Sequence, residues 1–364
     1  MQAQRPAAGE RVAIAMSGGV DSAVAAQCLM QAGCHPMGVT MRLWRQGQAC
    51  NDNSADLADA EAVCRHLGIP HRVVDLREPF RRLVVAPFVA GYAAGRTPNP
   101  CPGCNARVKF GLLRQAAHDM GNAWFATGHY ARIFRSAMGP ELFRGRDLAK
   151  DQSYVLYQLL GGGLQRAVFP LGNLLKSQVE AIAATLGLPT HHRAESQDLC
   201  FLPDGSYGDF VQRWAPEAVR PGPIRGIGGE TLGTHRGLAY YTVGQRRGLG
   251  IAAPEPYYVD RLDAASNTIY VAHAARLGSR TLEASALCYA HGRPPAAGSW
   301  VRAKIRYRSA AVAATVWPLR RARARIVFAH PLRDITPGQA VVLYQGERVV
   351  GGGTIQRAFT DEEA

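Results

Sequence analysis

The sequence predicts an α/β protein in three parts: a doubly wound parallel sheet, a small central β-rich domain and a C-terminal β-barrel. Strand-like and helix-like runs alternate from Arg11 to about Leu202, as in a parallel sheet with helices on both faces. Glycine becomes frequent after Pro203, and short alternating segments follow one another from Thr281, as in small barrels. We therefore expect domains at residues 1–203, 204–280 and 281–364.

The first domain is expected to open with a strand at Val12–Met16, a glycine-rich turn and a helix at Asp21–Ala32. Gly139-Pro140 later marks a hairpin inserted into this domain. Its other strands are predicted at residues 37–43, 72–76 and 123–127, and its other helices at 55–67, 79–92, 110–120, 153–160 and 176–186. In the last domain we expect strands at 300–307, 311–316, 322–328 and 340–344, and a loop at the glycine triplet 351–353.

Composition limits the class of protein. With 364 residues, 47% hydrophobic and 19% charged, the chain suits two or three globular domains, and no apolar run is long enough to cross a bilayer. Residues 1–10 lack the apolar core of a secretory signal, so we expect a cytoplasmic protein without membrane contact, whose eight cysteines are reduced. A net charge of +14 favours a polyanionic partner, although an arginine-rich composition alone would also produce it.

The densest motif lies between the first strand and the first helix, and it reads Ala15-Met16-Ser17-Gly18-Gly19-Val20-Asp21-Ser22. Its two glycines let backbone N–H groups approach an anion, and the helix N-terminus adds partial positive charge. The motif therefore predicts a phosphate site, and it lacks the lysine of the common NTP-binding loop. Asp21 would repel a phosphate unless a cation lay between them, which suggests Mg²⁺.

Three cysteines stand in contexts that suit chemistry. Cys101 and Cys104 lie among prolines that predict a stiff, non-helical loop ahead of a helix near residue 110, and Cys200 lies near the end of the domain. The helix N-terminus, Arg107 and Lys109 would lower the pKa of the Cys104 thiol. Such thiols suit sulfur exchange through mixed disulfides or ligation of an iron–sulfur cluster. A structural zinc would need a second Cys-x-x-Cys pair.

Together with further motifs, these segments resemble the tRNA-specific 2-thiouridylases, a family of N-type ATP pyrophosphatases, over nearly the whole chain. The motifs that carry the resemblance are SGGVDS at 17–22, GRTPNP at 95–100, CN at 104–105, KFG at 109–111, TGHYAR at 127–132, KDQSY at 150–154, CF at 200–201, YTVGQR at 241–246, RYR at 306–308 and GGG at 351–353. The resemblance implies a pyrophosphatase-type catalytic domain and two further domains, all contacting tRNA.

The resemblance also implies a sulfur transfer to the wobble uridine, position 34 of tRNA. ATP would adenylate the C2 oxygen and release pyrophosphate, and a persulfide on Cys200 would then attack C2 and displace AMP. Cys104 would next attack the carrier sulfur, which releases 2-thiouridine and leaves a Cys104–Cys200 disulfide. A cysteine desulfurase or sulfur-relay protein is implied as the sulfur donor, and the base must leave the anticodon stack to react.

By the same resemblance, the catalytic residues are Cys104 and Cys200, and ATP contacts Met41 and Gly128 in addition to residues 15–22. The residues expected to contact tRNA are Asn99, Pro100, Cys101, His129, Lys150, Asp151, Gln152, Arg306, Tyr307 and Gln345.

Cys101 departs from the family pattern, because many members carry Asp at this position. The acid–base or positioning role of that carboxylate therefore cannot be carried over to this chain. The trio of Cys101, Cys104 and Cys200 would instead suit a [4Fe–4S] cluster, and the resemblance extends to cluster-bearing thiolases. On the sequence alone, persulfide transfer and the cluster route both remain open.

Arginines of the last domain offer a surface for a polyanion. Arg321, Arg323 and Arg325 alternate with other residues in a predicted strand and would share one face, which is either a phosphate-binding stripe or solvated surface. Two other functions fit parts of the sequence. An amidating synthetase of the same superfamily would need an ammonia source, and the sequence has no glutaminase signature. A non-catalytic RNA-binding or sulfur-carrier protein would leave the motif at 15–22 unexplained.

Overall fold

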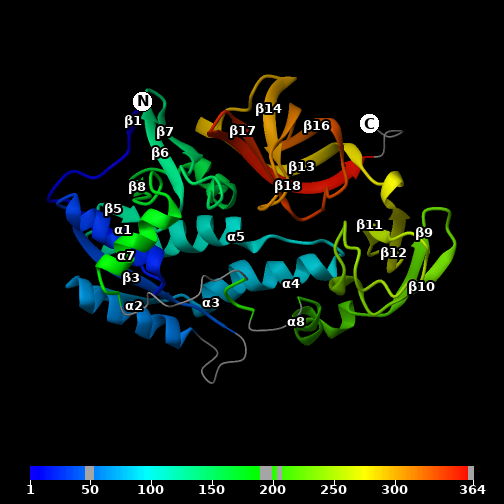
Figure 1. Ribbon diagram of the computed structural model, residues 1–364, viewed down its shortest axis with the longest axis horizontal. Coiled ribbons are helices and arrows are strands. Elements are labelled where there is room, and N and C mark those ends of the chain that lie inside the picture. The colour runs from blue at the N-terminus through cyan, green and yellow to red at the C-terminus, as the bar shows by residue number, and fades with distance from the viewer. Residues whose placement is uncertain (46–52, 189–198, 203–206, 360–364) are drawn as a thin grey trace.

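The computed structural model describes residues 1–45, 53–188, 199–202 and 207–359. Figure 1 shows its three parts: a parallel sheet with its helices at the left, a β-barrel at the top and a smaller sheet at the right. These parts confirm the predicted fold class. Among the described residues, no helix combines the length and the apolar character that spanning a bilayer requires.

The parallel sheet has the strand order β4-β3-β2-β5-β8. Its strands are β2 (Arg11–Ala15), β3 (His35–Arg42), β4 (His71–Asp75), β5 (Trp124–Ala126) and β8 (Ala167–Val168). The first of these strands, β2, is central, so the order reverses between β2 and β5. In open parallel sheets, ligands bind beyond the carboxyl ends of the strands at such a reversal. The segments that follow β2 and β5 are therefore the expected site.

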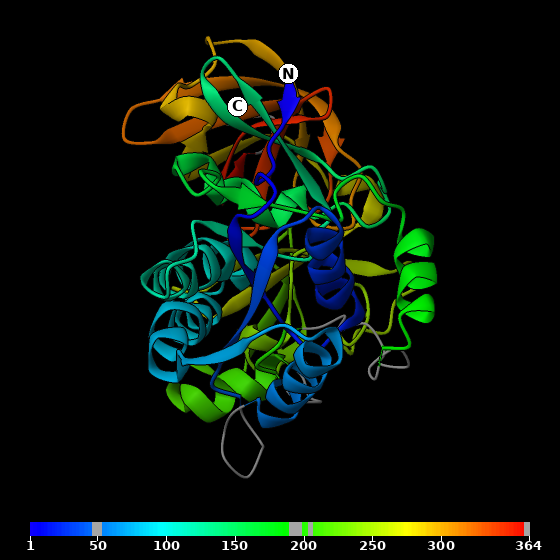
Figure 2. The same cartoon turned by 90° about the vertical axis from the view of Figure 1, so that its left-hand side faces the viewer.

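Helices cover both faces of this sheet, as Figure 2 shows from the side. Val12 and Ile14 of β2 pack on α1 (Val20–Gln31), α2 (Ser54–Leu67) and α7 (Lys176–Thr185). Ala13, which points the opposite way, belongs to the core on the other face, formed with the helices of residues 77–119 and with the 3₁₀-helix η3 (Ser153–Gly161). The helices before residue 95 on that face are α3 (Arg77–Phe80), η1 (Arg81–Val85) and α4 (Ala86–Ala93).

The helix that carries the first two cysteines begins earlier than predicted. A continuous helical stretch runs through α5 (Pro100–Gly103), the π-helical segment η2 (Cys104–Leu113) and α6 (Arg114–Asp119). Prolines are tolerated in a first helical turn because its N–H groups have no partner within the helix. Asn99 caps the helix, since its Oδ1 accepts a hydrogen bond from the N–H of Cys101 at 3.1 Å. The expectation of a non-helical loop up to residue 105 was wrong.

The barrel closes because β17 pairs with both β14 and β18. Its strands are β13 (Ser279–Tyr289), β14 (Ser299–Lys304), β15 (Val312–Leu319), β16 (Arg323–Leu332), β17 (Ala340–Gln345) and β18 (Arg348–Phe359). The glycine triplet 351–353 lies inside β18 and not in a predicted loop. Glycine suits this part of the strand because a Cβ at Gly352 would come within 2.6 Å of the Tyr157 ring. Arg321, with φ of 59°, lies in the turn before β16 and does not share a strand face with Arg323 and Arg325.

The hairpin of the first domain joins the barrel and not the parallel sheet. Strands β1 (Gln2–Ala3), β6 (Ala131–Ser136) and β7 (Gly139–Arg144) continue the barrel sheet in the order β1-β6-β7-β18. The N–H of Arg144 donates to the carbonyl of Glu347 at 2.9 Å, and the Arg132 guanidinium pairs with the Glu347 carboxylate at 2.8 Å. The alternating pattern predicts a hairpin, but the edge that it joins depends on a strand about 200 residues away in the chain.

The central part contains one helix and a four-stranded sheet of order β10-β9-β12-β11. These elements are α8 (Tyr207–Trp214), β9 (Gly222–Gly226), β10 (Thr231–His235), β11 (Tyr257–Asp263) and β12 (Thr268–His273), with short 3₁₀ turns at 216–218, 238–240 and 274–276. A further 3₁₀ turn at 290–292 follows β13 of the barrel. Phe210 of α8 packs against Phe88 and Phe201, at ring-centroid distances of 6.1 and 5.6 Å. The central part is thus anchored in the core of the first domain.

Candidate active site

The loop between β2 and α1 is held open by its own residues. Gly18 has φ of +75°, and a Cβ there would lie 2.6 Å from the Cβ of Asp59, so this position requires glycine. The Ser22 hydroxyl donates to the carbonyl of Gly19 at 2.9 Å and accepts from the N–H of Ser17 at 3.3 Å. Ser17 is exposed at the surface. The loop therefore presents a helix N-terminus to solvent, as anion-binding loops do.

Asp21, in the first turn of α1, has two partners from distant segments. Its Oδ1 accepts from the Tyr130 hydroxyl at 2.8 Å and from the Lys176 ammonium at 2.9 Å. Neither residue was predicted from the sequence. A signal for Lys176 was present, however, because a lysine at the start of a predicted helix opposes the helix dipole and calls for a nearby anion.

The segment after β5 joins the loop to the cysteine-bearing helix. A Cβ at Gly128 would lie 2.9 Å from the carbonyl carbon of Asp21, so the glycine lets this segment pack on the first turn of α1. His129 shares a hydrogen bond with the Thr127 hydroxyl at 2.7 Å and packs on the Phe110 ring. Burial, aided by the charge of Lys109, holds the pKa of His129 well below its ordinary value, so the ring is neutral. Met41 lies half-buried at the end of β3.

The three cysteines are free thiols that influence one another. Cys101 and Cys104 are half-buried, and Cys200 is exposed. Desolvation raises the pKa of Cys101 and of Cys104 to about 11 and that of Cys200 to about 12. The thiols also act on one another, since Cys200 raises the pKa of Cys101, Cys101 raises that of Cys104, and Cys104 raises that of Cys200. The predicted lowering of the Cys104 pKa was wrong. Lys109 and Arg107 do act in that direction, but burial outweighs them.

Lys109 is the cation that these thiols share. It follows Cys104 by one turn of the π-helix, in which residue i+5 stacks over residue i. Its charge lowers the pKa of Cys101, Cys104 and Cys200 alike, although less than burial raises it. A thiolate or persulfide anion formed at any of the three would therefore face the same ammonium group.

The sequence suggested two metal sites, a [4Fe–4S] cluster at the cysteines and Mg²⁺ at Asp21, and the structure fits the second better than the first. Over residues 1–45, 53–188, 199–202 and 207–359, the His, Cys, Asp and Glu side chains form no group of three or more that could hold a metal ion. The three cysteines thus do not present the ligand set of a [4Fe–4S] cluster. Asp21 fits Mg²⁺ better, because an NTP-bound Mg²⁺ commonly takes one carboxylate and completes its shell with phosphates and water.

A cavity of about 330 Å³ opens beside Asn99 and Pro100. It is lined by residues of all three parts of the chain, namely Phe88, Tyr92, Thr97, Pro98, Asn99, Pro100, Leu199, Tyr207, Thr242, Arg306 and Gln339. The Tyr207 ring is stacked on that of Tyr92, with centroids 6.0 Å apart. Aromatic walls with a few polar groups are typical of small-ligand sites, and this volume lies at the small end of their range. Leu199 and Pro100 of the lining are the chain neighbours of Cys200 and Cys101.

Thr97 and Arg306 tie the cavity wall together. Thr97 donates its N–H to the carbonyl of Pro337 at 2.9 Å and accepts from the Gln339 amide at 2.8 Å. The Arg306 guanidinium donates to the Val243 carbonyl at 2.8 Å and to the Thr336 hydroxyl at 2.6 Å. The cavity therefore exists only while the barrel and the central part are docked on the first domain.

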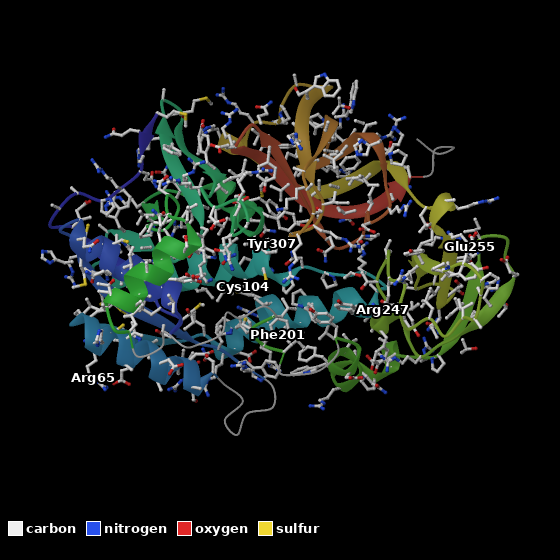
Figure 3. All side chains as sticks on the ribbon, viewed as in Figure 1. Arg65, Cys104, Phe201, Arg247, Glu255 and Tyr307 are labelled. Atoms are coloured by element: carbon white, nitrogen blue, oxygen red, sulfur yellow. The ribbon has the colours of Figure 1, made fainter. Side chains whose placement is uncertain are left out.

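The remaining residues expected to contact tRNA differ in access. Tyr307 is 39% exposed, and its ring lies 5.6 Å from the Lys304 ammonium; Figure 3 shows it above Cys104. Gln345 is exposed at the end of β17, and Lys150 and Gln152 are half-buried. Asp151 is buried, and its carboxylate accepts from the backbone N–H groups of residues 145 and 153. The Asp151 carboxylate therefore braces the start of η3, and its contact with tRNA stays a prediction.

The arginines of β16 are partly neutralised. Arg323 forms an ion pair with Glu283, which also lies 3.7 Å from Arg357. Arg325 stands over the Phe359 ring at 5.2 Å. All three guanidinium groups remain accessible, so they surround a single buried carboxylate with an excess of positive charge.

Comparison with known proteins fits this arrangement. Three family models match in succession: the "tRNA methyl transferase HUP domain" at residues 10–204, the "tRNA methyl transferase PRC-barrel domain" at 208–273 and the "Aminomethyltransferase beta-barrel domain" at 279–355. A tRNA-specific 2-thiouridylase of Acidithiobacillus ferrooxidans is 45% identical over 350 residues, covering 96% of this chain and 99% of the relative. One of Moorella thermoacetica is 45% identical over 353 residues, covering 94% and 98%.

The chain belongs to the tRNA-specific 2-thiouridylase family. Although two of the family models are described by methyl transfer, the relatives that match this chain over nearly their full length are described by thiolation.

Solved structures are similar to this chain at a lower level. A U34-tRNA thiolase of Methanococcus maripaludis with a [4Fe–4S] cluster is 16% identical, with a TM-score of 0.36 over 58% of this chain and 69% of that one. A 4-thiouridine synthetase in complex with RNA and ATP is 16% identical, with a TM-score of 0.35 over 57% and 51%.

Proposed function

We propose that this enzyme uses ATP to replace the C2 oxygen of the wobble uridine of tRNA by sulfur, through a persulfide on Cys200. The observation that carries the proposal is the junction at residues 127–129. On one side this segment packs on the phosphate-type loop through Gly128, and on the other it packs on the cysteine-bearing helix through His129. The place where ATP activates the base and the place where the sulfur nucleophile is held are therefore joined by a single short segment.

The cavity beside Asn99 supplies a place for the base. The aromatic rings of Tyr92 and Tyr207 offer apolar walls, and Arg306 and Gln339 offer donors to uracil oxygens. A uridine whose base left the anticodon stack would enter this cavity next to Leu199 and hence next to the thiols. The exposed Tyr307 and Lys304 would then lie at its border as contacts for the RNA.

The chemistry divides between the two ends of the site. Adenylation of the C2 oxygen breaks the α–β bond of ATP and makes AMP the leaving group, and Asp21 would hold the Mg²⁺ that neutralises the phosphates. The terminal sulfur of the Cys200 persulfide attacks C2, and the C–O bond to AMP breaks. The Cys104 thiolate then attacks the carrier sulfur, breaking its bond to the transferred sulfur. The positive charge of Lys109 favours both the persulfide anion and the Cys104 thiolate. A two-electron reductant then reduces the resulting Cys104–Cys200 disulfide and restores the two thiols.

The decisive experiment is nucleoside mass spectrometry of an unmodified tRNA after incubation with ATP and a sulfur donor, either a desulfurase with cysteine or a sulfur-relay protein. We expect 2-thiouridine at position 34 and pyrophosphate release that depends on tRNA. Pyrophosphate release that needs neither tRNA nor Cys104 would instead indicate an amidating synthetase. The absence of any release would indicate a binding protein.

Cys101 separates the persulfide route from the cluster route. Because the trio does not present a cluster ligand set, Cys101→Ser should retain thiolation within about threefold and the purified enzyme should be colourless. Loss of activity in Cys101→Ser, together with iron–sulfur absorption in anaerobically purified protein, would overturn the persulfide proposal.

A further inference from the structure

The loop at residues 15–22 lacks a lysine, yet the fold brings one to it. Lys176 is 155 positions away from Asp21 in the chain, and its ammonium lies 2.9 Å from the Asp21 carboxylate. The Lys176 side chain is only 13% exposed, so it is packed in this position and does not lie loosely on the surface. Exposed ion pairs contribute little to stability, but a largely buried lysine is costly unless it has an anionic partner.

The location of this lysine is unfavourable for a cation in the absence of an anion. Lys176 is the first residue of α7, and its side chain reaches the first turn of α1. The partial positive charges of two helix N-termini, of helices 12 and 10 residues long, therefore act on the same ammonium. Asp21 and Asp147, whose Oδ2 accepts from the N–H of Lys176 at 2.9 Å, offset this repulsion.

We propose that Lys176 is a polyphosphate-binding residue: its ammonium binds the pyrophosphate portion of ATP and takes the place of the lysine missing from the loop. The inference rests on ATP binding at residues 15–22. The amides of the loop, the ammonium of Lys176 and the hydroxyl of Tyr130 form one cradle around Asp21. In the absence of nucleotide, Asp21 holds the ammonium in place; when the phosphates bind, Lys176 donates to a phosphate oxygen.

This role predicts a selective loss of affinity. A charge-assisted hydrogen bond contributes roughly 1.5–3 kcal/mol, so Lys176→Met should weaken binding of ATP and of pyrophosphate about ten- to a hundredfold. Binding of AMP, which carries neither the β- nor the γ-phosphate, should change less than about threefold. Lys176→Arg keeps the charge and should recover part of the affinity for pyrophosphate.

The test is calorimetric titration of the full-length enzyme with ATP, pyrophosphate and AMP, with thermal unfolding measured on each variant. Arg65→Met is the matched control, because Arg65 also forms an ion pair at 2.9 Å, with Glu61, but on the exposed face of α2. It should leave all three affinities unchanged.

Equal loss of AMP and pyrophosphate affinity in Lys176→Met, or no loss in a folded variant, would overturn the inference and reduce Lys176 to a structural partner of Asp21. If Lys176→Met unfolds, retention of pyrophosphate selectivity by Lys176→Arg supports the proposal and equal weakening of all ligands by it counts against it. Wild-type enzyme that binds no ATP would contradict the proposed function itself, and the two failures are thus distinguishable.

Discussion

The phosphate-type loop and the base cavity are built in opposite ways. The loop consists of eight consecutive residues, is fixed largely by its own serines and glycines, and accepts side-chain hydrogen bonds from Tyr130 and Lys176. The cavity has walls from all three parts of the chain. The pKa values of the Cys104 and Cys200 thiols are raised, so both are protonated at neutral pH. ATP binding should therefore survive changes that loosen the domains, whereas sulfur transfer should not. The four predictions below test that contrast.

The largest effect is expected from the thiols. Cys104→Ser and Cys200→Ser should each lower thiolation by roughly three orders of magnitude or more, because each removes a nucleophile for which nothing else substitutes. Both variants should still bind ATP and release pyrophosphate in the presence of tRNA. Cys288→Ser, a half-buried cysteine of β13, is the control and should keep full activity. A substantial loss of ATP binding in Cys104→Ser would mean that the two ends of the site are not separate.

The next effect concerns the loop alone. Gly18→Ala adds a Cβ only 2.6 Å from that of Asp59 at a positive φ, so the loop must distort, and ATP affinity should fall about ten- to a hundredfold. Gly68→Ala is the control, since its φ is +68° and a Cβ there meets nothing within 4 Å. Nucleotide titration checks both variants. Equal effects of the two would assign the loss to general backbone strain.

A smaller effect is expected from the seam between domains. Arg306→Ala removes the bonds to Val243 and Thr336, so the cavity wall loosens and thiolation should fall about tenfold at unchanged ATP affinity. The slope of log Kd for tRNA against log salt should stay unchanged, because the Arg306 guanidinium bonds to protein groups and not to a phosphate. A change of about 0.9, the value for one phosphate contact, would show that Arg306 instead binds the RNA backbone.

The last prediction concerns pH and has the smallest effect on thiolation itself. Because the pKa of Cys104 is raised from 9.0 to about 11, its alkylation at pH 8 should be about a hundredfold slower than that of a free thiol. Lys109→Met removes the charge that lowers this pKa and should slow the reaction further. A raised thiol pKa favours the folded state below pH 9, so stability should decline as pH rises from 9 towards 11. A Cys104 that reacts at the rate of a free thiol would contradict the burial.

The features of the fold and the site that could be predicted from the sequence are those formed by residues close together in the chain. The strand, turn and helix around Gly18 lie where the apolar periodicity placed them, since the glycines and the helix start are contiguous in the chain. The start of the helix at Pro100 was missed, although Asn99 followed by proline is an N-cap signal, because the prolines alone were weighed. Lys176, Tyr207 and the docking of Thr97 on Pro337 depend on contacts between distant segments, and periodicity carries no information about those. The pKa of Cys104 was misjudged for the same reason: burial is a tertiary property.

The sheet that the hairpin shares with the barrel imposes an order on folding during synthesis at the ribosome. Strands β6 and β7 are complete once residue 144 has been made, but the edge of β7 has no partner until β18 is synthesised from residue 348 onwards. Throughout that interval an open strand edge, the most aggregation-prone feature of a sheet, stays exposed. The catalytic domain thus cannot reach its final form before the last strand of the chain arrives, and a ribosome that stalls within the barrel leaves the enzyme's first domain unfinished.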